Sequence, residues 1–227
     1  MPYRLILDDG AVVTVPRVTE VVEAGMPKPA IVAWERRGAV RWAADHPVAA
    51  RHDPDAALRG FQRQQHAAQR GQTLHAWIAA MVAEEPMSPL PASHRGYQEA
   101  FSAWAEEHHP VLAGALLEQT LCDYAGTVAG RADCILADGH LIDWKTTETL
   151  ADRPWPDHVA QLGAYASMVR LVDDKGRVGE ISPFVAKASV VQLVSNGEHR
   201  TWTWDRFNTD DRSLHQAMAL WRAVPAW

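Results

Sequence analysis

Cysteine is scarce in this sequence of 227 residues, which contains only Cys122 and Cys134. The two cysteines lack the paired C-x-x-C spacing of metal sites, and they are too few for an iron–sulfur cluster held by cysteines alone. We therefore expect no iron–sulfur cluster. Two free thiols are the simplest state for such a pair, which favours a cytoplasmic protein.

Long apolar runs and several common catalytic motifs are also missing. No run of about 18 apolar residues exists, so we expect no membrane span, and the first residues do not resemble a signal peptide. The sequence contains no G-x-x-x-x-G-K-[ST] loop for ATP, no H-E-x-x-H zinc motif and no G-x-S-x-G elbow. These absences argue against an ATP motor, a zinc enzyme and a serine hydrolase.

Positive charge is limited and unevenly distributed. The net charge of -6 argues against general affinity for nucleic acid. The stretch 28–70, however, is net basic and is predicted to be helical. We expect Arg36 and Arg37 in this stretch to bind DNA in a salt-sensitive manner, although a solvated helix surface accounts for them equally well.

Hydrophobic patterning and turn residues predict the following order of elements. A hairpin is expected over 3–15, and helices over 19–24, 29–43, 53–81 (interrupted at Gly71) and 97–109. Strands are then expected over 116–121, 126–136 and 140–146, a helix over 157–172, strands over 189–194 and 200–204, and a helix over 210–224. This order predicts an α/β or α+β fold, with a mixed central sheet flanked by helices and an N-terminal helical region.

The scarcity of lysine makes one predicted strand stand out. The only lysines are Lys28, Lys145, Lys175 and Lys187. Side chains alternate along a strand, so Asp143 and Lys145 share one face while Trp144 points to the other. A cation bound by the aspartate and a phosphate near the lysine would account for charged groups in such a place; an ion pair at a sheet edge is the alternative.

Two more carboxylates fall on neighbouring strands. The turn at Asp138-Gly139 brings Asp133 toward Asp143, and two close carboxylates repel each other unless a cation neutralises them. Glu118, on the strand before, is a third candidate ligand or an exposed residue of the outer face. Oxygen ligands of this kind suit Mg²⁺ or Mn²⁺.

Several flanking residues are weaker candidates when taken singly. His75 lies on a predicted helix, where a lone histidine is more often structural than a ligand. Gln161 and Tyr165 are spaced i, i+4 and share one helix face. Trp155, between two prolines after the 140–146 strand, could stack on a base or pack against the final strands.

The order of these signals resembles the RecB-like branch of the PD-(D/E)XK nuclease superfamily. The match is carried by Gly71 and His75, Glu118, Gly130 and Asp133, Asp143 and Lys145, and Gln161 and Tyr165. The stretch 15–34 also resembles the opening of phage exonucleases in that group. The resemblance implies a restriction-endonuclease-like core, with residues 1–110 forming an N-terminal region of the same domain and residues 111–227 the nuclease core.

The resemblance also implies residue roles. Asp133 and Asp143 would bind the metal and be catalytic, with His75, Glu118 and the backbone carbonyl of Trp144 as further ligands. Lys145 would position or activate the attacking water, and Gln161 and Tyr165 would face the substrate.

The function that we expect is a metal-dependent DNA exonuclease, acting from DNA ends in phage or prophage recombination, replication or repair. Its expected partners are DNA and, as one candidate, a separate single-strand annealing protein. The alternative is a non-catalytic nucleic-acid-binding protein that keeps the fold, which the intact set of Asp133, Asp143 and Lys145 argues against.

Overall fold

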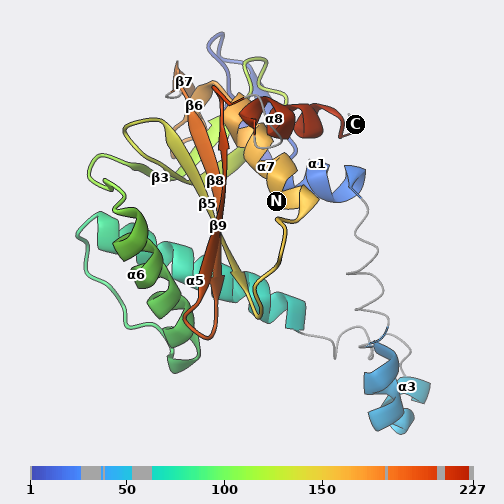
Figure 1. The fold of residues 1–227 in the computed structure, drawn as a ribbon. Helices are drawn as coiled ribbons and strands as arrows, with labels where there is room; N and C mark the ends of the chain where they lie inside the picture. The colour runs from blue at the N-terminus through green and yellow to red at the C-terminus, as the bar shows by residue number, and fades with distance from the viewer. Residues whose placement is uncertain are drawn as a thin grey trace.

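A seven-stranded mixed sheet forms the centre of the protein (Figure 1). The computed structural model describes residues 2–26, 37, 39–52, 63–181, 184–208 and 213–224. The sheet has the order β7-β6-β3-β4-β5-β8-β9. Its strands are β3 Leu116–Cys122, β4 Ala129–Ile135, β5 His140–Thr147, β6 Arg170–Val172, β7 Val178–Ile181, β8 Lys187–Val194 and β9 His199–Asp205. Strands β5 and β8 run parallel, while the other neighbouring pairs among these named strands are antiparallel.

Helices cover both faces of this sheet. The helices of the described residues are α1 Val18–Gly25, α3 Pro47–His52, α5 Arg63–Val82, the short 3-10 helix η1 Ala92–His94, α6 Arg95–His108, α7 Pro156–Ser167 and α8 Leu214–Arg222. Figure 1 shows α3 apart from the sheet. Figure 1 shows α5 and α6 on one side of the sheet and α1, α7 and α8 on the other. A separate antiparallel hairpin, β1 Tyr3–Ile6 with β2 Val12–Val15, precedes α1.

Side chains alternate along β5, so this strand packs against both helix layers. Leu141 belongs to the apolar cluster shared with α1, α7 and α8, whereas Ile142 and Trp144 belong to the cluster under α5 and α6. The indole of Trp144 makes edge contacts with Phe101 and Trp104 of α6. The predicted orientation of this strand is therefore observed, because Trp144 points to the face opposite that of Leu141.

The predicted fold class is confirmed: a mixed sheet carries helices on both faces, as in a restriction-endonuclease-like core. The hairpin, the helix over 97–109 and the five predicted strands of the sheet are also observed, whereas β7 was not predicted. The predicted helix over 29–43 and the start of the helix over 53–81 lie largely outside the described residues. None of the helices in the described part combines the length and the apolar character that a membrane span requires.

Two predicted features are wrong. The helix over 157–172 ends at Ser167, and Arg170–Val172 forms β6 instead, because it supplies hydrogen-bonding partners for the outer side of β3. Gly71 does not interrupt its helix, since α5 runs through it. A Cβ at Gly71 would lie 3.6 Å from the Thr146 hydroxyl oxygen, an ordinary contact distance, so the helix passes close to β5 without requiring a glycine there.

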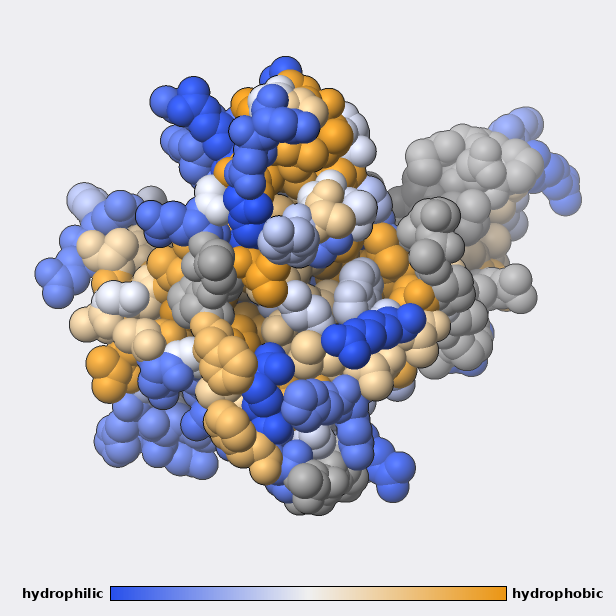
Figure 2. All heavy atoms as spheres, turned by 90° about the horizontal axis from the view of Figure 1, so that it is seen from above, coloured by the Kyte–Doolittle hydropathy of each residue, from blue (hydrophilic) through white to orange (hydrophobic). Residues whose placement is uncertain are grey.

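The surface seen from above is mixed. In Figure 2, hydrophilic residues surround small patches of hydrophobic residues on this face. Scattered apolar residues of this kind are normal on a folded domain.

Candidate metal centre

The β4–β5 ladder opens at the point where the candidate carboxylates lie. The two strands pair at Cys134–Ile142 and Ile135–Leu141. One residue earlier on β4, the Asp133 carboxylate accepts a hydrogen bond from the Trp144 amide at 2.8 Å. A side chain thus takes the place that a backbone carbonyl would have in a continued ladder. The opening gives Asp133 access to a cavity between the strands and the helices.

This cavity has a volume of about 670 Å³ and brings together residues from distant parts of the chain. It is lined by His75 and Gln72 of α5, by Glu118, Asp133 and Lys145 of the sheet, and by Gln161 of α7. Tyr3 of the hairpin and Thr19 of α1 also line it. The N-terminal elements therefore form part of the same site as the strands.

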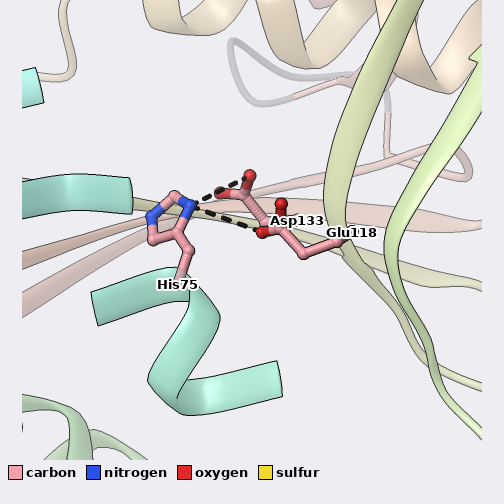
Figure 3. Close-up of side chains that lie close together, drawn as sticks. All are labelled: His75, Glu118 and Asp133. Carbon is pink, nitrogen blue, oxygen red and sulfur yellow. Dashed lines mark ion pairs between the residues drawn. The ribbon is translucent and has the colours of Figure 1, made fainter. Parts of the chain in front are cut away.

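Three side chains converge in this cavity, as Figure 3 shows. The Nδ1 atom of His75 lies 3.4 Å from an Asp133 oxygen and 3.6 Å from a Glu118 oxygen. One potential ligand atom from each of the three residues lies within 4.8 Å of the others. A nitrogen and two carboxylate oxygens at this spacing can hold one divalent cation.

His75 is oriented by a second contact on its other ring nitrogen. The Trp144 carbonyl can only accept a hydrogen bond, and it lies 3.0 Å from His75 Nε2. The proton on Nε2 therefore leaves Nδ1 as the nitrogen that faces the carboxylates. Metal-binding histidines are commonly fixed in this way by a carbonyl on the second nitrogen. The Trp144 carbonyl itself was expected to be a ligand, and that role stays a prediction.

The charges in this cluster favour a cation between the carboxylates. Burial alone would lower the pKa of His75, but the carboxylate of Asp133 raises it above its ordinary value. Burial would raise the pKa of Asp133, but His75 and the Trp144 amide lower it. The neighbouring carboxylates thus stabilise a proton on His75, and a metal ion would compete with that proton for the ring nitrogen.

Glu118 reaches the cluster because the backbone of β3 is irregular there. Its φ of 48° lies in the left-handed region, which is costly for a residue with a side chain. Leu117 and Leu121 are four residues apart and would share one face of a regular strand, yet they pack in opposite helix layers. The irregularity at Glu118 thus changes which side of the sheet these residues face.

Arg131 holds Glu118 from the other side. Its Nε atom lies 2.9 Å from the second Glu118 oxygen. Burial, followed by the charge of Asp133, raises the pKa of Glu118, while Arg131 opposes that rise. Arg131 was missed as a site residue, although it lies two residues before Asp133 and strand alternation could have identified it.

A chain of hydrogen bonds extends from the buried aspartate on β5. Lys145 Nζ lies 2.9 and 2.8 Å from the two oxygens of Asp143, a side chain with no exposed surface. The same ammonium donates to the Gln161 oxygen at 3.0 Å, and the Gln161 amide donates to the Tyr165 hydroxyl at 2.9 Å. Sequence spacing predicts that Gln161 and Tyr165 share one helix face. The structure adds the hydrogen bond that joins Gln161 to Lys145.

Burial affects the two charged partners differently. It raises the pKa of Asp143 to about 6, against the opposing effect of Lys145. It would lower the pKa of Lys145, but the charges of Asp143 and Asp133 outweigh it and raise that pKa. Lys145 therefore remains a fixed positive charge at neutral pH, 20% exposed at the edge of the cavity.

The remaining predicted residues differ in whether they line this cavity. Trp155 precedes α7, is 43% exposed and lines the same cavity. Arg37 is exposed and, among the described residues, is not one that lines this cavity, while Arg36 lies outside the described residues. A role for either arginine in DNA binding stays a prediction.

The sequence and the structure were compared with known proteins. No protein-family model matches the sequence, and no curated protein matches it. The chain is similar to the solved structure of SSO0001, with a TM-score of 0.39 and 15% identity, over 92% of this chain and 74% of that one. It is also similar to an alkaline exonuclease (LHK-Exo) from Laribacter hongkongensis, with a TM-score of 0.36 and 14% identity, over 67% of this chain and 76% of that one. Neither likeness is close enough to carry an argument about activity.

Proposed function

We propose that this protein is a divalent-metal-dependent deoxyribonuclease. The observation that carries the proposal is the meeting of His75, Glu118 and Asp133 in one cavity that is also lined by Lys145, the ion-pair partner of the buried Asp143. A carboxylate-rich site with a neighbouring fixed ammonium suits the hydrolysis of a phosphodiester, because negative charge increases on the phosphate as the reaction proceeds.

The donor set fits Mn²⁺ or Mg²⁺. Asp133 and Glu118 supply the hard oxygen atoms that both ions prefer, and His75 supplies a nitrogen that Mn²⁺ accepts more readily than Mg²⁺. A bound divalent ion lowers the pKa of a water molecule and neutralises charge on the phosphate. Asp143 is the further carboxylate that the sequence resemblance assigns to the metal.

The protein's own residues then have separate tasks. Lys145 places a positive charge beside the reacting phosphate, and the side-chain oxygen of Gln161 fixes the direction of its ammonium. Tyr165 in turn accepts from Gln161 and keeps that amide in one orientation. Cleavage from DNA ends, and a role in phage recombination beside a single-strand annealing protein, are finer proposals that rest on the sequence resemblance.

The test is incubation of the purified protein with end-labelled linear DNA and closed circular DNA, in the presence of Mn²⁺, Mg²⁺ or EDTA. The Lys145→Ala variant is compared with Lys175→Ala, which removes an exposed lysine from the turn before β7. We expect metal-dependent loss of the linear DNA in the wild type and in Lys175→Ala, and no loss in Lys145→Ala.

The other outcomes are equally informative. Cutting of the circle would show an endonuclease and reject the preference for ends. Undiminished cleavage by Lys145→Ala would show that the site is wrongly assigned. DNA binding without cleavage under either metal would favour a non-catalytic nucleic-acid-binding protein.

A further inference from the structure

A second cavity adjoins the metal centre at the carboxyl ends of the parallel strands β5 and β8. It has a volume of about 490 Å³ and lies between α5, η1 and the start of α6. Its lining includes Arg70, Thr73, His94, Tyr97, Glu148 and Ser195. The chain neighbours of two of these residues, Gly71 and Thr147, line the metal-centre cavity, so the same segments of α5 and β5 border both cavities. Crevices at the carboxyl ends of parallel strands are common ligand sites.

Three polar atoms from the lining residues of this cavity are buried without a hydrogen-bond partner. They are Arg70 Nε, His94 Nε2 and the Tyr97 hydroxyl. Ser195 and Glu148 lie close enough to affect the pKa of Tyr97 but do not complete a hydrogen bond with its hydroxyl. Buried polar groups are nearly always paired in folded proteins, so three such atoms around one cavity are available to a polar ligand or to ordered water.

The chemistry of these atoms favours an anion. Arg70 is permanently charged, and its guanidinium lies 4.8 Å from the centre of the Tyr97 ring, which holds it in place. Burial raises the pKa of Tyr97, so its hydroxyl keeps its proton and can donate. Burial and the charge of Arg70 lower the pKa of His94, so this ring is neutral and offers one N–H.

The Glu148 carboxylate pairs with one nitrogen of the Arg70 guanidinium, which a phosphate oxygen could bind in its place. Its oxygen lies 2.8 Å from Arg70 Nη1, which leaves the Nε atom without a partner. The Glu148 side chain is 70% exposed, whereas that of Arg70 is 18% exposed. An exposed carboxylate of this kind is easily displaced, because its ion pair competes with water and salt.

We propose that Arg70, with Tyr97 and His94, binds a backbone phosphate of the DNA next to the phosphate at the metal centre, and that Glu148 competes for the same arginine. This inference rests on the proposed function. Close packing supports a defined shape for the site, since a Cβ at Gly96 would clash with the backbone of Ser195.

The test measures equilibrium binding of a labelled DNA duplex by fluorescence anisotropy in EDTA, over a series of salt concentrations. Arg70→Gln is expected to weaken binding about tenfold and to reduce the slope of log affinity against log salt by about 0.9, the value for one lost phosphate contact. Glu148→Gln is expected to strengthen binding, because the competing carboxylate is removed.

Arg170→Gln is the matched control. Arg170 is 15% exposed and pairs at 2.7 Å with Asp8, which is 67% exposed, so it resembles Arg70 in burial and pairing. It lies on β6 and is expected to leave both affinity and slope unchanged. Equal weakening by Arg70→Gln and Glu148→Gln would mean that the pair is only structural, and wild-type affinity and slope in Arg70→Gln would also overturn the proposal.

Cleavage is measured in parallel, so that the two proposals fail separately. A wild type that binds DNA but never cleaves it refutes the nuclease, while the salt slopes still decide the phosphate contact. A wild type that cleaves normally and an Arg70→Gln variant with unchanged binding refute the phosphate contact alone. A wild type that binds no DNA refutes both.

Discussion

Replacing Lys145 with methionine tests the energetics of the buried pair, because methionine keeps an unbranched apolar chain as far as the Cε atom and removes the charged ammonium. Asp143 has no exposed surface and depends on that ammonium for its counter-charge. Without it, we expect the carboxyl to take up a proton. An ordinary aspartate has a pKa near 3.9, and each pH unit above it adds about 1.4 kcal/mol. Keeping the proton at pH 7 therefore costs at most about 4 kcal/mol of unfolding free energy relative to a pH below about 3.9, and the wild type already loses part of this amount.

The size of this loss should depend on pH in a defined direction. The wild-type pKa of Asp143 is already about 6, raised first by burial. A carboxyl whose pKa is higher in the folded state contributes stability at low pH and loses it as the pH rises. In the wild type the loss of stability ends near pH 6, where folded Asp143 gives up its proton. In Lys145→Met the folded carboxyl keeps its proton, so the loss of stability continues above pH 6. The difference in stability should therefore grow by about 1.4 kcal/mol per pH unit above pH 6.

Urea unfolding followed by circular dichroism in EDTA, between about pH 6 and pH 8, measures this difference. Addition of Asp143→Asn to Lys145→Met removes the titrating group and should abolish the growth with pH. A difference that stays constant over the same range would refute the argument. Domains are commonly stable by about 5–15 kcal/mol, so we expect the single variant to stay folded.

Three further predictions concern metal, substrate and thiols. Mn²⁺ at about one hundred times its dissociation constant should stabilise the wild type by about 2.7 kcal/mol in thermal unfolding, and an equal shift in Asp133→Asn would contradict the ligand assignment. Trp155→Ala should weaken DNA binding by about 1–3 kcal/mol through lost stacking, as measured by anisotropy; unchanged affinity would remove that role. Burial raises the pKa of Cys122 to about 11 and that of Cys134 to about 12, so both should react with Ellman's reagent only after unfolding. Prompt reaction of the native protein would show that the thiols are accessible.

Much of the strand core could be predicted because its signals are local. A two-residue period places Asp143 and Lys145 on one face, and the Asp138-Gly139 turn determines which strand lies beside β5. The structure has these features, with Gly139 at a φ of 81°. The placement of these side chains on the sheet thus depends on rules that act over a few residues.

The features that were missed depend on distant contacts. Strand β6 has only three residues and exists because the side of β3 away from β4 accepts a partner. The left-handed backbone of Glu118 has no signature in its own sequence, since a glycine or asparagine would be the usual residue there. The cavity at Arg70 requires the ends of two strands and two helices to meet, which no window of sequence contains.

The dispersed origin of the metal-centre cavity affects when activity can arise during folding. Its donors come from α5, β3 and β4, its lysine from β5 and the glutamine that orients that lysine from α7. Strand β5 in turn lies beside β8, and this parallel pairing joins residues more than forty positions apart. Such long-range pairings are slow to form. A nascent or partly folded chain therefore lacks a complete donor set, so the proposed metal binding should be acquired together with the native fold.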